Sequence, residues 1–131
     1  TPGSIGIYCQ GQFRAVRPGT EAFDQLTAQL SDGLWGLKRW TSLSMSESTR
    51  NEYVEGNESQ VLEFRFNPPA TIHSYYRFFK NFDALIVPLT GRHANASPVF
   101  GLKGDRILAG ALHLESNAPL MSVVHDQSLC P

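Results

Sequence analysis

The sequence contains no long hydrophobic run and no excess of charge of one sign. Its longest aliphatic run, Ala84 to Val87, stops at Pro88, whereas a membrane-spanning helix needs about 20 apolar residues. The chain has 11 Lys and Arg residues against 12 Asp and Glu residues, which gives a net charge of −1. We therefore expect no membrane span and no general attraction to nucleic acid or anionic lipid.

The common catalytic motifs are also missing. The chain has no Gly-rich dinucleotide loop, no HExxH metal motif, no GxSxG nucleophile motif and no EF-hand loop. The four histidines are scattered and show no metal-ligand spacing; they are His73, His93, His113 and His125. We expect no metal and no cofactor, and the sequence favours a non-enzyme.

Only two cysteines are present, Cys9 and Cys130, close to the two ends of the chain. A bridge between them would tie the first strand to the last residues, and an even cysteine count in an exported chain favours pairing. Two unrelated free thiols are the alternative. We predict the disulfide, and with it an extracytoplasmic location, periplasmic or secreted; the absence of Met at Thr1 is consistent with processing or with an expression scar.

The composition is that of one globular domain spanning residues 1–131. Apolar residues make up 41% of the chain and charged residues 18%, which is enough to form one core without a metal or a partner.

The N-terminal half predicts strands around one helix. Thr20 is expected to cap a helix that ends near Asp32 and Gly33. Alternation over Leu34–Met45 predicts a long strand with Trp35 on its apolar face. The acidic, polar segment Ser46–Asn57 predicts a mobile connection. The other expected strands are Ser4–Cys9, Gln12–Val16 and Gln60–Phe66.

The C-terminal half predicts a second helix and further strands. Pro68 and Pro69 are expected to begin the helix, with an apolar stripe at helical spacing; the stripe is Ile72, Tyr75, Tyr76 and Phe79. The strands expected after it are Ala84–Leu89, a hairpin of Pro98–Leu102 with Arg106–Leu114, and Leu120–Val124.

Together these elements predict an α+β fold. The order strand-helix-strand-strand-helix-strand is ferredoxin-like, with two helices on one face of an antiparallel sheet and an added C-terminal β-hairpin. The comparison concerns architecture alone and implies no function.

Two places carry candidate functional residues. On the second predicted helix, His73, Arg77 and Lys80 share one face, which is either a solvated face or a basic binding surface. The polar loop Thr90–Ser97 follows a buried strand, and binding groups concentrate in such loops. Its candidates are Arg92 to clamp an anion, His93 to carry a proton, and Asn95 to bind. A plain surface connection is the alternative.

These observations favour a binding module over an enzyme. We expect an extracytoplasmic interaction domain, such as an envelope-assembly subunit, a secreted recognition domain or a toxin-neutralising inhibitor. Its partner is expected to be a protein, of acidic character, that meets Arg77 and Lys80 or the Thr90–Ser97 loop. The alternative is a small cofactor-independent enzyme using Arg92 and His93, aided by Asp83 or His113.

Overall fold

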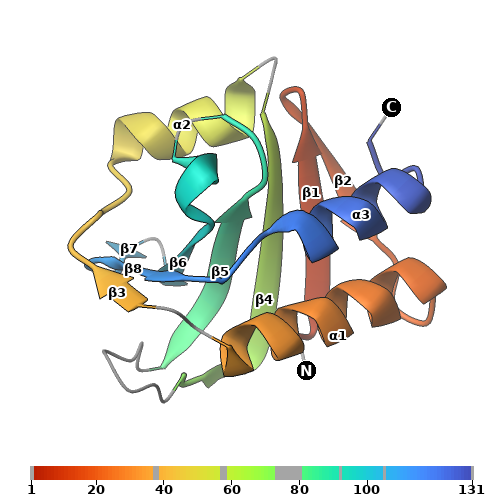
Figure 1. Cartoon of the computed structure of the whole chain (residues 1–131), viewed down its shortest axis with the longest axis horizontal. Helices are drawn as coiled ribbons and strands as arrows, with labels where there is room; N and C mark the ends of the chain where they lie inside the picture. The colour runs from red at the N-terminus through yellow and green to blue at the C-terminus, as the bar shows by residue number, and fades with distance from the viewer. Residues whose placement is uncertain are drawn as a thin grey trace.

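A computed structural model describes residues 2–36, 39–56, 59–72, 81–91, 93–104 and 106–130 of the chain. The described residues form an α+β fold with an antiparallel sheet and three α-helices (Figure 1). The helices are α1 (Glu21–Trp35), α2 (Glu47–Glu55) and α3 (Ala118–Asp126). The strands are β1 (Ser4–Cys9), β2 (Gln12–Val16), β3 (Arg39–Thr41), β4 (Gln60–Ala70), β5 (Phe82–Pro88), β6 (Pro98–Lys103), β7 (Arg106–Ile107) and β8 (Ala111–His113).

In this part of the chain the strand order is β2-β1-β4-β5-β6-β8-β3, with β7 paired to β6 off that path. Every strand pair is antiparallel. Strand β2 therefore forms one end of the sheet, joined to β1 by a two-residue turn at Gln10 and Gly11. Both turn residues have positive φ, which is the geometry of the type I′ turn that suits a two-residue hairpin.

The two faces of the sheet carry separate hydrophobic cores. Helices α1 and α3 lie side by side across one face (Figure 1). There they bury Leu26, Leu30 and Leu120 against alternate strand residues such as Ile7 and Phe64. Helix α2 covers part of the other face, where its Tyr53 packs with Met45, Val61, Ile86 and Phe100. The central strands are therefore buried on both sides.

Cys9 and Cys130 form the predicted disulfide, with Cα atoms 5.6 Å apart. It joins the end of β1 to the residues that follow α3, and Cys9 Sγ also lies 3.4 Å from the carbonyl oxygen of Leu129. The bridge spans 121 positions of the sequence, so it fixes the last helix to the first strand.

The segment predicted as a mobile loop is helix α2, and that prediction was wrong. Ser46 caps the helix, with its Oγ accepting a hydrogen bond from the Thr49 N–H at 3.1 Å. The helix has almost no apolar surface of its own, but Thr49 and Tyr53 lie one turn apart and are both buried. Packing of that narrow stripe on the sheet stabilises a segment whose composition alone suggests a loop.

The expected strand Leu120–Val124 lies in helix α3. Its buried residues Leu120, Val123 and Val124 follow the three- and four-residue spacing of a helix face, and Pro119 stands in the first turn. The apolar run is short enough to fit either a strand or a helix. The exposure of both Met121 and Ser122 matches the helical period rather than the two-residue period of a strand.

Pro68 and Pro69 do not begin a helix but lie near the end of strand β4. The rest of that predicted helix, residues 73–80, lies outside the described residues. The ferredoxin-like order is not confirmed: β1 and β2 precede α1, and α2 falls between β3 and β4. β6 and β7 do pair across Gly104, but α3 follows them, so no terminal hairpin is confirmed.

Within the predicted strand Leu34–Met45, the described residues form a strand over β3, and its first residues belong to α1, which continues through Gly33 to Trp35. Gly33 is a close approach rather than a helix end, since a Cβ there would lie 3.0 Å from a methyl group of Leu114. Trp35, predicted on a buried face, is 90% exposed.

Candidate binding surface

Of the five predicted binding residues, His93 and Asn95 belong to the described part of the chain. Arg77, Lys80 and Arg92 lie outside it. His93 is half-buried with a φ of 66°, and Asn95 is exposed in the short 3-10 turn Ala94–Ala96. Neither side chain hydrogen-bonds to another described residue, so nothing described brings an acid or base group to His93.

The loop that holds them is fixed by Asn117, a residue that the sequence did not single out. The Asn117 side-chain amide donates to the carbonyl oxygens of Ala94 and Pro88, at 3.2 and 3.4 Å. Its backbone N–H donates to Ser97 Oγ at 3.1 Å. These hydrogen bonds anchor the described residues of the loop to the start of α3.

His113 has a structural environment. Its Nδ1 lies 2.8 Å from the carbonyl oxygen of Ala96, so this nitrogen carries the proton. Its Nε2 lies 2.7 Å from Thr41 Oγ1, and the ring is 3% exposed. Both ring nitrogens are therefore hydrogen-bonded within the protein, one to the backbone of Ala96 and one to the side chain of Thr41.

A different group of residues gathers on the sheet face opposite α1 and α3, which we call the Tyr8 surface. Its members come from three strands and one helix: Tyr8 of β1, Phe13 of β2, Glu63 and Arg65 of β4, and Arg50 of α2. Ile7 and Cys9 face the first core, so the alternation of β1 directs Tyr8 to the opposite face. Phe13 is its cross-strand partner, and the two ring centroids are 5.0 Å apart.

Gly6 leaves room on the sheet for the Phe13 ring of this aromatic pair. The Phe13 ring lies across the Cα of Gly6, and any Cβ at position 6 would overlap the Phe13 ring carbons. Phe13 remains 53% exposed even so. A large aromatic side chain is thus held flat on the sheet with much of its surface open to solvent.

Arg65 is held in place by a buried carboxylate. Glu63 is 6% exposed, and its two oxygens accept hydrogen bonds from Arg65 Nη2 and Nε at 3.0 and 3.3 Å. The Arg65 side chain is 48% exposed. A guanidinium has five N–H groups, so three of them form no hydrogen bond with another described residue, while the side chain is already oriented by Glu63.

The charges of this group act on Tyr8. Burial and the nearby carboxylate of Glu63 raise the pKa of Tyr8 above its ordinary value of 10.0, while Arg65 and Arg50 pull it down. The Tyr8 hydroxyl is therefore protonated at neutral pH and available as a hydrogen-bond donor. Arg50, which is half-buried on α2, therefore lies within electrostatic reach of Tyr8.

Substitutions of the two flanking charges should move the Tyr8 pKa in opposite directions. Glu63→Gln should lower it and Arg50→Gln should raise it, because the first removes a negative and the second a positive charge. The folded chain binds the phenolic proton more tightly than the unfolded chain. Its contribution to stability is therefore present below pH 10 and is lost as the pH rises beyond it. Titration of the Tyr8 ¹³Cζ resonance measures the Tyr8 pKa in each variant. Changes of the same sign in the two variants would contradict this placement of the charges.

A recess adjoins Arg65 at the end of the sheet where β1 begins. Its volume is about 650 Å³, and it is lined by Gly3, Ser4, Arg65, Phe66, Asn67, Pro69 and Asp83. Asp83 Oδ2 accepts a hydrogen bond from the Gly104 N–H at 2.7 Å. The recess extends the Tyr8 surface beyond Arg65 and gives a partner side chain room beside the guanidinium.

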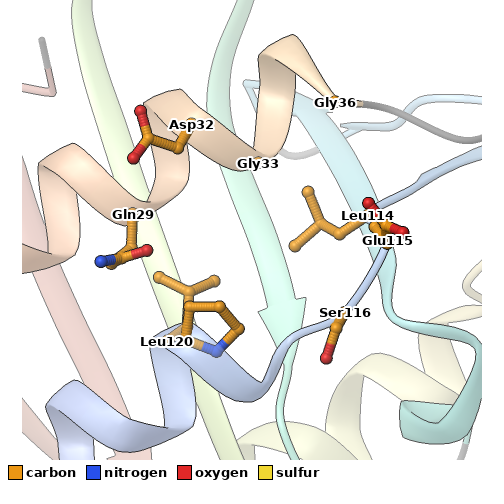
Figure 2. A pocket seen from close by; sticks show the side chains of 9 residues that line it. Gln29, Asp32, Gly33, Gly36, Leu114, Glu115, Ser116 and Leu120 are labelled. Atoms are coloured by element: carbon orange, nitrogen blue, oxygen red, sulfur yellow. The ribbon is translucent and has the colours of Figure 1, made fainter.

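A second cavity, of about 300 Å³, lies between the end of α1 and the segment that leads into α3. Figure 2 shows Leu114 and Leu120 directed into the space between the two helices. The carboxylates of Asp32 and Glu115 lie at opposite ends of it, and Ser116 points away from both. The labelled polar side chains around the cavity do not converge on one point.

The described residues contain no group of three or more His, Cys, Asp or Glu side chains that could hold a metal ion. None of the described helices is both long and apolar enough to cross a bilayer.

The chain matches no protein-family model, and comparisons with curated proteins and with solved structures find no significant match.

Proposed function

We propose that this chain is an extracytoplasmic binding domain that recognises an acidic protein partner through the Tyr8 surface. The observation that carries the proposal is the exposed Phe13 ring, packed on half-buried Tyr8 beside Arg65, whose guanidinium is oriented in advance by Glu63. Tyr and Arg are enriched in binding hot spots, since they combine a large contact area with few degrees of freedom to restrict.

The charge of the surface favours an acidic partner. Among the described residues, Glu63 pairs with only one of the two arginines of this surface, and Arg50 and three N–H groups of Arg65 have no carboxylate partner there. A partner carboxylate would form a bidentate pair with Arg65, the geometry in which Arg exceeds Lys. The Cys9–Cys130 disulfide supports a location where disulfides persist.

Two substitutions should weaken partner binding while the fold stays intact. Phe13→Ala removes the exposed ring, and Arg65→Lys keeps a positive charge beside Glu63 but loses the planar fork. We expect each to weaken binding about tenfold or more, as loss of a hot-spot contact does. Arg50→Gln should flatten the salt dependence of the association rate.

Photo-crosslinking identifies the partner for this measurement. A photoreactive residue replaces Phe13 in one protein and Met121 in a matched control, because Met121 is 37% exposed on α3, across the sheet. Partner affinity is then measured by calorimetry for wild type and variants. Crosslinking from position 121 alone, or equal affinity of Phe13→Ala and wild type, would refute the Tyr8 surface as the interface.

A further inference from the structure

The outer edge of β2 is open among the described residues. Strand β2 pairs with β1 on one side, and no described strand pairs with its other side. Figure 1 likewise shows no element beside β2 on the side away from β1 in the sheet. Four of its five residues, Gln12 to Ala15, are exposed. A free edge of this kind is a template for another strand.

The hairpin geometry shows which backbone groups this edge offers. In the two-residue turn, Cys9 and Gln12 are the turn's outer residues and form a hydrogen-bonded pair. Antiparallel pairs alternate, so Ile7 and Arg14 form the next hydrogen-bonded pair, while Phe13 faces Tyr8 without ladder bonds. The N–H and C=O groups of Phe13 and Ala15 therefore point outward.

No backbone hydrogen bond within the described residues uses these four outward groups. They can pair with an incoming strand without disturbing the β1–β2 ladder. Phe13 thus belongs both to the Tyr8 surface, through its ring, and to the free edge, through its backbone.

The side chains along β2 specify the incoming strand. In an antiparallel addition, Arg14 would occupy a position where facing side chains lie closest, and an acidic residue opposite it would be stabilising. The residue opposite Phe13 would lie on the face of the exposed ring, where an apolar side chain gains contact area. Self-pairing centred on Arg14 would place two arginines opposite each other, which is destabilising.

We propose that the partner binds by adding an extended strand to β2, with an acidic residue opposite Arg14 flanked by residues opposite Phe13 and Ala15. This inference rests on the proposed function and specifies how the partner is held: backbone bonds supply affinity and alternate side chains supply specificity.

Position 15 offers a sharp test. Ala15→Pro removes one outward N–H, and proline is tolerated on an edge strand when its missing N–H faces solvent. Ala15→Val is the matched control, because it retains the N–H and favours the strand. A library of random eight-residue peptides is selected on the wild-type protein, and the enriched peptides are measured against both variants.

We expect enriched peptides that alternate acidic and apolar residues. They should slow amide hydrogen exchange at Phe13 and Ala15 and lose about tenfold in affinity for Ala15→Pro, as one lost backbone hydrogen bond predicts. Ala15→Val should bind them as the wild type does.

The other outcomes separate this proposal from the proposed function. Peptides that depend on Phe13 and Arg65 side chains, but bind Ala15→Pro normally and leave both amides unprotected, would overturn strand addition and leave the Tyr8 surface standing. Absence of any enriched peptide would overturn strand addition. A concentration-dependent dimer that Ala15→Pro dissociates would replace the acidic partner with a second copy of the chain.

Discussion

Replacing Cys9 and Cys130 together with serine should lower the free energy of unfolding by about 4 to 5 kcal/mol. The bridge closes a loop of 121 positions, so its removal greatly enlarges the conformational freedom of the unfolded chain. A loss of this size is a large part of the stability of an ordinary domain, which is about 5 to 15 kcal/mol.

Urea unfolding measures this effect directly. The double-serine variant and the reduced, alkylated wild type should agree, since both lack the bridge. Amide exchange should also accelerate at the end of α3, which the bridge holds against β1. Equal unfolding midpoints with and without reductant would show that the disulfide contributes little.

The elements that sequence analysis located correctly are those whose pattern is local. The strands Ser4–Cys9 and Gln12–Val16 match β1 and β2, and the Thr20 cap begins α1 as predicted. In each case a turn or a capping residue lies next to a periodic stretch, so the signal needs no knowledge of the rest of the chain.

The errors arise where tertiary contacts override local composition. Segment 46–57 has the polar composition of a loop, yet it folds as α2 because the sheet buries Thr49 and Tyr53. The alternation of apolar and polar residues over Gln60–Phe66 is typical of a strand with one solvated face, but Val61 and Glu63 on that face are buried. These residues are buried because the second hydrophobic core, which includes Val61, lies on the face of the sheet that the sequence pattern assigned to solvent.

The candidate site was missed for the same reason. Its members come from β1, β2, α2 and β4, which only the sheet order brings together. One local signal was present: Glu63 and Arg65 are two residues apart, so they share a face of the strand and can pair. The place of Arg50 could not be predicted, because its segment was expected to be a loop.

Phe100→Ala should destabilise the chain by about 3 to 5 kcal/mol. Phe100 is fully buried in the second core, where it packs with Tyr53 of α2 and with Met45. Its truncation leaves a cavity beneath the helix that carries Arg50, so α2 should be the first element to lose protection in amide exchange.

Phe13→Ala is the matched control for this variant, because it removes the same side chain from the same sheet face at an exposed position. It should cost about 1 kcal/mol or less, the value of its contact with Tyr8. Denaturant melts of the two variants give the comparison. Equal losses would mean that the second core contributes no more than the exposed surface, and that α2 is not held by burial against the sheet.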